Sequence, residues 1–326
     1  MLSIIYSSPF IPPEWIAAHG LRPQWLPLHR GDGRGPTGAP RGVCPYAGAM
    51  LDAALEGAPG HAYVMTTACD QMRYAAAVAD QRGHAPVFLL HVPATWQTRA
   101  ARQLYSEELK RLGRFLEALG GRAPFADELA RIMRQYDAAR DAFRNARPRL
   151  SGRQGAQALA ELRGLPGPPG VRAGRAPGSG VPLAVLGGPW LEADGAIFDF
   201  IEQANGRVVL DATEAGERTL PAPFDPWRTE HRPLEELVDA YFGSIPDVFR
   251  RPNAALYEWL ARQLAARDVR GIVFRRYVWC DLWHAELPRL KECCRLPVLD
   301  LNAAMDDAGA AARVQGQIEA FLELLR

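Results

Sequence analysis

The feature that most constrains the fold is an alternation of short apolar stretches with longer segments of helical periodicity, which continues along the whole chain. Such alternation is typical of βα units, which build mostly parallel sheets covered by helices. A chain of 326 residues is about twice the length of a common domain. We therefore expect an α/β protein with two Rossmann-like (flavodoxin-like) domains, mostly parallel sheets and helical insertions.

Strands are expected at eight short apolar stretches, namely residues 2–6, 25–28, 63–67, 86–91, 183–186, 208–211, 272–278 and 298–301. The helical segment 104–119 places Tyr105 and four leucines on one face, which predicts a packed amphipathic helix. A second helical segment, 126–144, is rich in Arg, Asp and Ala. For that helix we expect only shallow burial.

A domain boundary is expected where Gly and Pro fill more than half of the positions, at residues 164–180. Regular structure does not persist in such a composition. The segment divides the chain into an N-terminal α/β domain with a helical segment, residues 1–163, and a C-terminal α/β domain, residues 181–326. The first carries Cys44 and Cys69, and the second carries Cys280.

Charge and hydropathy exclude several classes of protein. Lys and Arg number 38 against 37 Asp and Glu, so no overall field attracts nucleic acid or an anionic membrane. The longest apolar runs fall far below the roughly 20 residues that cross a bilayer, and the start of the chain has no basic segment or cleavage site of a signal peptide. Five irregularly spaced cysteines suit a reducing compartment. We expect a soluble, cytoplasmic protein without a nucleic-acid or membrane partner.

Three cysteines occupy the same kind of place in the predicted structure. Cys69 and Cys280 each follow an apolar strand, Cys44 follows a Gly/Pro-rich loop, and a helical pattern begins after each of them. Ligands of open α/β sheets collect outside the carboxyl ends of strands, so the three thiols could converge on one metal. A helix N-terminus also favours the thiolate. The alternative is that each cysteine is a small buried hydrophobic residue, since no Cys-x-x-Cys occurs.

The other two cysteines and a nearby histidine give weaker evidence for a metal site. Cys293 and Cys294 are adjacent late in an amphipathic segment, and we expect them to pack or to be incidental thiols. His284 lies one helical turn after Cys280 and could reach a metal, although a lone helical histidine more often faces solvent. Three thiolates with His284 would make a closed tetrahedral zinc site, which is the alternative to any cluster.

Glycine and arginine motifs suggest structural roles. We interpret Gly187-Gly188-Pro189 as a tight turn between strand and helix rather than an anion site. The doublets 250–251 and 275–276 are expected to be solvated charges rather than phosphate contacts. No Gly-x-x-x-x-Gly-Lys-[Ser/Thr] and no Gly-x-Ser-x-Gly occurs, which predicts neither ATP hydrolysis by this chain alone nor a serine hydrolase.

Taken together, several segments resemble the cluster-binding subunits of the 2-hydroxyacyl-CoA dehydratase and benzoyl-CoA reductase family. The most specific is the box Cys280-Asp281-x-Trp283, which ends in Leu-Pro-Val-Leu at 296–299. The order and contexts of the three cysteines also fit the family. The further matching segments are residues 12–23, Cys44, Cys69-Asp70-x-Met72-Arg73 and 148–152.

The resemblance implies that Cys44, Cys69 and Cys280 hold one [4Fe–4S] cluster in the cleft between the two domains, with a fourth iron lacking a cysteine. Thiolates are the usual ligands of such clusters. In the family the open iron meets a CoA-thioester carbonyl, and one low-potential electron gives a ketyl radical, which permits dehydration or ring reduction. A separate ATP-hydrolysing iron–sulfur activator delivers the electron, and a homologous second subunit completes the enzyme. The residues flanking the ligands, and so expected around the cluster, are Asp70, Arg73, Asp281 and Trp283.

Two further arrangements stay open within this resemblance. One subgroup forms homodimers that hold a double-cubane [8Fe–9S] cluster with three cysteines from each chain and reduce small molecules. The chain is also short for the family, because its Gly/Pro segment replaces a connecting region expected to be helical. That difference favours a non-catalytic electron-relay or structural cluster subunit as the remaining alternative.

Overall fold

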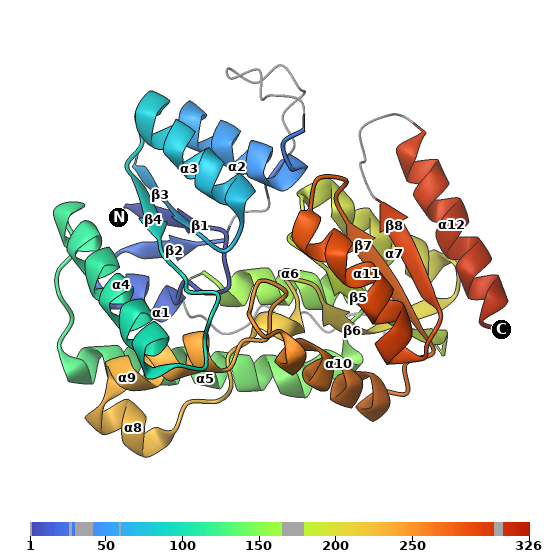
Figure 1. The fold of residues 1–326 in the computed structure, drawn as a ribbon. Coiled ribbons are helices and arrows are strands. Elements are labelled where there is room, and N and C mark those ends of the chain that lie inside the picture. Colours follow the sequence, from blue (N-terminus) through green and yellow to red (C-terminus); the bar gives the residue numbers. More distant parts are fainter. Residues whose placement is uncertain (1, 26–27, 30–41, 59, 165–178, 303–308) are drawn as a thin grey trace.

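The protein is described by a computed structural model that covers residues 2–25, 28–29, 42–58, 60–164, 179–302 and 309–326. In this part of the chain two four-stranded sheets, each entirely parallel, have the orders β2-β1-β3-β4 and β6-β5-β7-β8. This confirms the predicted α/β fold with two Rossmann-like domains, which lie side by side in Figure 1. The strands are β1 (Ser3–Tyr6), β2 (Arg22–Gln24), β3 (His61–Thr66), β4 (Val87–Leu90), β5 (Val181–Gly187), β6 (Gly206–Ala212), β7 (Gly271–Arg276) and β8 (Val298–Asn302).

Helices cover both faces of each sheet. None of the helices in the described ranges is long and apolar enough to span a membrane. The α-helices are α1 (Pro13–Ala18), α2 (Pro45–Glu56), α3 (Asp70–Arg82), α4 (Arg99–Ala118), α5 (Ala126–Ala146), α6 (Gly152–Leu162), α7 (Ala196–Gln203), α8 (Pro226–His231), α9 (Pro233–Val238), α10 (Ala254–Ala266), α11 (Asp281–Cys294) and α12 (Ala310–Leu324). Shorter helical segments are η1 (Arg147–Arg149), η2 (Glu192–Gly195), η3 (Glu217–Thr219) and η4 (Asp239–Gly243).

Alternate residues of each strand serve two different cores, because successive side chains of a strand point to opposite faces. On the first sheet, Ile5 and Tyr63 pack with α2 and α3, whereas their neighbours Ile4 and Val64 pack with α1, α4 and α5. The second sheet repeats this arrangement, with α7 and α12 on one face and α10 and α11 on the other. Strands buried on both faces explain the continuous apolar stretches of the sequence.

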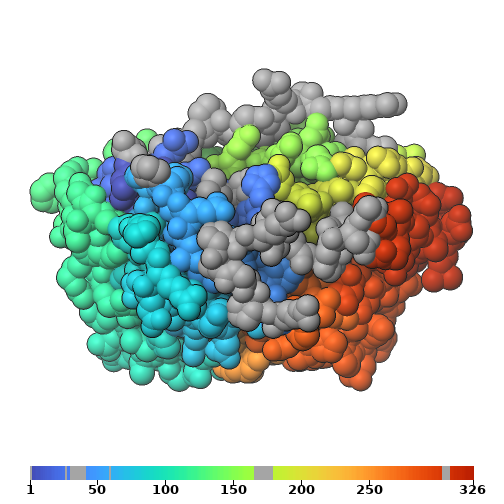
Figure 2. Space-filling model, turned by 90° about the horizontal axis from the view of Figure 1, so that it is seen from above, coloured from blue at the N-terminus to red at the C-terminus, as the bar shows by residue number. Residues whose placement is uncertain are grey.

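The chain crosses between the two halves of the molecule. The segment α8, α9 and η4 follows β6 in sequence but packs on α4 and α5, below the first sheet in Figure 1. Conversely, α6 precedes the Gly/Pro-rich segment but packs against β6 and α7. In the space-filling view, residues of the first sheet and its helices lie on one side and those around β7 and α12 on the other (Figure 2). Most of the expected linker, residues 165–178, lies outside the described residues.

Two expectations about local structure need comment. Half of the strand predicted at 25–28, residues 26–27, lies outside the described residues, and the strand found in this region is β2, where Arg22 and Pro23 pair with Ser3 and Ile4 of β1. The proline is accommodated because β2 is an edge strand, so its missing N–H faces away from the ladder. The helix predicted at 126–144 is deeply rather than shallowly buried, because α5 packs against α1 on one side and α8 and α9 on another.

The arginine doublets were also predicted wrongly as solvated charge, because only Arg251 is exposed. Arg275 is 0% exposed and donates to Asp194, and Arg276 donates to Asp300 over 2.9 Å. Arg250 lies 4.5 Å above the rings of both Phe10 and Phe242 and donates to the Phe242 carbonyl. Buried charges persist where they are paired or fully hydrogen-bonded.

Candidate functional site

One cavity lies where the switch points of the two sheets face each other. In each sheet the strand order reverses beside its first strand, between β1 and β3 and between β5 and β7. Open α/β sheets bind ligands outside the carboxyl ends of strands at such a point. The segments that follow these four strands contribute Ser7, Cys69, Pro189 and Cys280 to a single cavity of about 70 Å³. Both domains therefore build the same site.

Each of the three predicted cysteines lines this cavity from the first turn of a different helix. Cys44 precedes α2, Cys69 precedes α3 and Cys280 precedes α11, each at the N-cap position. Their carbonyls accept the first helical hydrogen bonds, such as the 2.9 Å bond from the amide of His284 to Cys280. The Cys44 amide donates to the Gln71 side chain over 3.2 Å, which ties the first two loops together. Three helix N-termini thus favour negative charge in one place.

Burial governs the protonation of these thiols in the absence of a metal. It raises the pKa of Cys44 and Cys69, and it raises the pKa of Cys280 to about 12. Backbone N–H groups near each sulfur oppose this effect, although no sulfur makes a full capping hydrogen bond. The thiols also raise one another's pKa, as Cys44 and Cys69 do for Cys280. A coordinated metal reverses this preference, because it deprotonates a ligating thiol outright.

Among the described residues, the lining of this cavity does not form a closed site for a single metal ion. A water molecule occupies ~30 Å³, so a cavity of about 70 Å³ has room for a group larger than one ion. No three His, Cys, Asp or Glu side chains in the described ranges converge closely enough to hold a single metal ion. His284, which the zinc alternative requires as a fourth ligand, is exposed on α11 and does not line the cavity. Three thiolates around a larger space match iron–sulfur ligation.

The flanking residues singled out in the sequence occupy different places. Trp283 is buried and lines the cavity. Asp70 is 95% exposed and lies 3.6 Å from Arg73, which also donates to the Thr67 carbonyl over 3.2 Å. Asp281 is exposed, and none of these three polar side chains lines the cavity. Trp283 alone of the four therefore contacts the space enclosed by the thiols.

Sequence reasoning missed two carboxylates in the cavity wall, Glu214 and Asp247. Burial, reinforced by the charge of Asp247, raises the pKa of Glu214 to about 8. The Glu214 amide donates to the Gly187 carbonyl over 3.1 Å, which fixes this loop at the end of β5. Glu214 lies two residues beyond β6, so its position at a strand's carboxyl end was the available signal. Asp247 has no comparable signal.

A buried arginine, Arg218, holds the second carboxylate in place. It donates to Asp247 over 2.8 Å, to the Pro246 carbonyl over 2.6 Å and to the Ala212 carbonyl over 3.0 Å. Its guanidinium also lies 5.2 Å from the Trp283 ring centre. Charge-assisted bonds of this kind fix geometry as well as contributing energy. Asp247 therefore faces the cavity as a rigidly held group.

The loop around Pro189 is fixed by a second buried network. Arg275 donates to the Pro189 carbonyl and to Asp194, and the Tyr277 hydroxyl also donates to Asp194. The Leu191 amide donates to Asp194 over 2.8 Å. Because Tyr277 lies three residues before Cys280, the same network positions the third thiol. Rigid support of this kind is what a metal ligand set requires.

Glycine at 187 is required by close packing at the end of β5. Its φ is 154°, and a Cβ there would lie 1.9 Å from the Arg275 carbonyl oxygen. A Cβ on Gly188 would meet the Trp283 ring at 3.0 Å. Gly187 therefore lets β5 and β7 approach beside the cavity, and Gly188 leaves room for the Trp283 ring.

Comparison with known proteins identifies the family to which the chain belongs. The chain matches no curated protein. The model of the family described as 2-hydroxyglutaryl-CoA dehydratase, D-component, matches residues 9–325, nearly the whole chain. The chain therefore belongs to this family and is a dehydratase component of the 2-hydroxyacyl-CoA dehydratase type.

Proposed function

We propose that the chain is the iron–sulfur subunit of an ATP-driven dehydratase or reductase that acts on a CoA thioester in the cytoplasm. Cys44, Cys69 and Cys280 hold a [4Fe–4S] cluster between the two domains. A related second subunit completes the enzyme, and a separate ATP-hydrolysing iron–sulfur activator supplies electrons. The observation that carries this proposal is the convergence of three thiols, each from a different helix N-terminus, on one cavity.

The bound cluster would supply one-electron transfer and an iron without a protein ligand, to which a thioester carbonyl oxygen could bind. The protein's own contribution is to hold and shield this centre. Phe10, Met72 and Trp283 line the cavity and limit access of water. The N-termini of α2, α3 and α11 favour the negative charge of thiolate-bound iron.

The two carboxylates of the cavity wall have different tasks. With a pKa of about 8, Glu214 keeps its proton on a carboxyl oxygen near neutral pH and can donate a hydrogen bond into the cavity. Asp247 is held by Arg218 and keeps its acceptor atoms in a fixed direction. A protonated acid beside a fixed acceptor suits a reaction in which hydroxide leaves.

Replacement of single cysteines tests the ligand assignment. In anaerobically purified protein, Cys280→Ser should lower iron content strongly, because it removes one of three cluster ligands. Cys294→Ser is the matched control, since Cys294 ends the same helix that Cys280 begins and does not line the cavity. Equal loss of iron from both variants would contradict the assignment.

Oligomeric state distinguishes the assembly, because both arrangements hold about four irons per chain. The proposal predicts about four irons per chain and a stable complex only with the related subunit. A homodimer that reduces small molecules, with about eight irons shared between two chains, would show instead that the chain belongs to the double-cubane subgroup. An iron-loaded chain that supports no turnover with its partner and activator would indicate an electron-relay role.

A further inference from the structure

A second cavity, separate from the cysteines, lies along the free edge of the second sheet. Its volume is about 310 Å³, at the lower end of the range of ~300–1,000 Å³ typical of small-molecule sites. It shares no lining residue with the cavity of the thiols. Four arginines from different parts of the chain line it together with one carboxylate, namely Arg144, Arg147, Arg207, Arg267 and Glu217.

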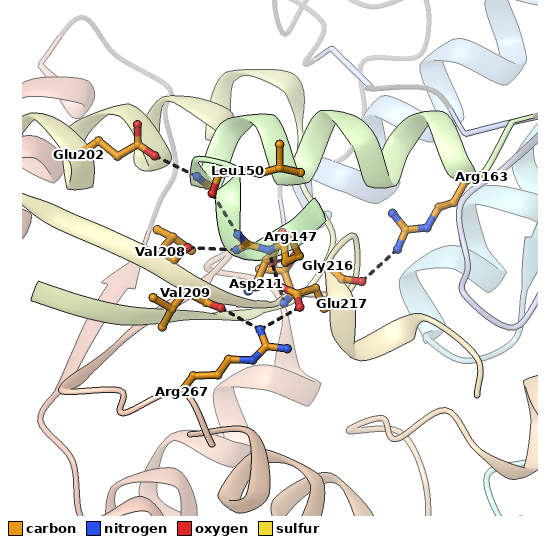
Figure 3. Close-up of polar contacts among 12 residues, drawn as sticks. Arg147, Leu150, Arg163, Glu202, Val208, Val209, Asp211, Gly216, Glu217 and Arg267 are labelled. Atoms are coloured by element: carbon orange, nitrogen blue, oxygen red, sulfur yellow. Dashed lines mark hydrogen bonds and ion pairs between the residues drawn. The ribbon is translucent and has the colours of Figure 1, made fainter. Parts of the chain in front are cut away.

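Two of these arginines donate hydrogen bonds to carbonyl groups at the edge of the sheet. Strand β6 is an edge strand, and its free carbonyl groups would otherwise lack donors. Arg147 donates to the Val208 carbonyl over 3.0 Å, and Arg267 donates to the Val209 carbonyl over 2.8 Å. Both also pair with Glu217, over 2.7 and 2.8 Å (Figure 3). This part of the cavity wall is therefore rigid and already neutralised in part.

Of the four arginines, Arg207 alone has no ion-pair partner among the described residues. Arg144 donates to Asp141 over 2.6 Å and to the Pro221 carbonyl over 3.0 Å, but its Asp partner does not line the cavity. Among the described residues, Arg207 has no hydrogen-bond or ion-pair partner, and its Nε atom is buried. Arg207 as a whole is half-buried, so the rest of its guanidinium is accessible from the cavity. An N–H donor that is buried without a partner is costly for the fold, and a ligand bound in the cavity would supply acceptors to a guanidinium that the fold leaves unpaired.

We propose that this cavity binds the phosphate groups of a small phosphorylated molecule, with Arg207 as a principal contact. Planar guanidinium groups match phosphate oxygens in pairs, and several of them meet here beside the edge of the sheet. Only one carboxylate opposes them in the lining, and it is shared by Arg147 and Arg267. The phosphates could come from the nucleotide end of a CoA thioester or from a free nucleotide.

Calorimetric titration of the purified full-length chain tests the proposal, with pyrophosphate, ADP and CoA as separate probes. At least one probe should bind, and Arg207→Gln should raise its Kd by about tenfold or more, because a charge-assisted bond is lost. Arg134→Gln is the matched control, since it removes the same charge from the exposed face of α5, and it should change the Kd less than twofold. Tighter binding of CoA than of ADP assigns the site to CoA, and the reverse assigns it to a free nucleotide.

Stability separates a ligand contact from a structural one. Because Nε of Arg207 has no partner in the fold, Arg207→Gln should leave the urea midpoint of unfolding unchanged or higher. The proposal is overturned if none of the three probes binds at millimolar concentration, or if Arg207→Gln binds them as the wild type does. Neither result depends on iron content, so failure here leaves the assignment of the cluster ligands unaffected.

Discussion

Replacement of Arg218 by methionine should destabilise the protein more than loss of any surface ion pair. The Arg218 side chain is 0% exposed and its partner Asp247 is 8% exposed. The substitution leaves a buried carboxylate without its counter-ion and two carbonyl groups, of Ala212 and Pro246, without a donor. Breaking a buried ion pair from one side costs about 3–5 kcal/mol.

That cost converts into a measurable shift in melting temperature. An unfolding entropy of about 2.1 cal/mol/K per residue gives about 0.7 kcal/mol/K for a cooperative unit of this length. A loss of about 4 kcal/mol therefore lowers Tm by about 6 °C. Differential scanning calorimetry of the metal-free chain measures the shift in Tm, and urea unfolding measures the loss in free energy of unfolding.

Two further variants show whether uncompensated charge is the cause. Adding Asp247→Asn to Arg218→Met should recover part of the loss, because an amide carries no charge to leave unpaired. Arg122→Met breaks an exposed pair with Glu128 and should cost less than about 1 kcal/mol. A loss for Arg218→Met no larger than that for Arg122→Met would refute the account of this network.

Three other predictions concern the same region. Burial raises the pKa of Glu214 from its ordinary value of 4.5 to about 8 in the folded protein. Between these two pH values the folded state binds more protons than the unfolded state, so the free energy of unfolding should fall as pH rises from 4.5 to about 8. Urea unfolding should show that this free energy changes less with pH in Glu214→Gln than in the wild type, and an equal change would contradict the assignment. Gly187→Ala should lower the free energy of unfolding by more than about 3 kcal/mol, because the added Cβ meets the Arg275 backbone. Gly243→Ala is the control: its Cβ meets open space, and its free energy of unfolding should stay within about 0.5 kcal/mol of the wild-type value. Asp194→Asn should lower Tm by several degrees, since it weakens the acceptor shared by Arg275 and Tyr277, and an unchanged melting curve would show that this network does not support the loop before Cys280.

The α/β architecture could be predicted because its signal is local. Strands such as β3 and β7 are buried on both faces, and each leaves a continuous apolar stretch in the sequence. The same strands place Cys69 and Cys280 just beyond their carboxyl ends, so the positions of these thiols follow from the rule for ligand sites in open sheets. Cys44 follows no strand directly, and its place at the cavity depends on α2.

Features that depend on distant partners were missed. Arg275 is buried because Asp194 lies 81 positions earlier in the chain but beside it in space. Asp247 reaches the cavity because the segment from α8 to η4 returns to the first half of the molecule. No periodicity or spacing reports such crossings. The deep burial of α5 has the same origin, since α8 and α9 cover a helix whose composition suggested exposure.

The most direct test of the central claim is the content of iron and acid-labile sulfide in the wild-type chain, purified and measured under anaerobic conditions. The account predicts brown protein with about four irons and four sulfides per chain, and with little zinc. Colourless protein that holds one zinc ion and no sulfide would contradict it, because Cys44, Cys69 and Cys280 would then serve a different centre.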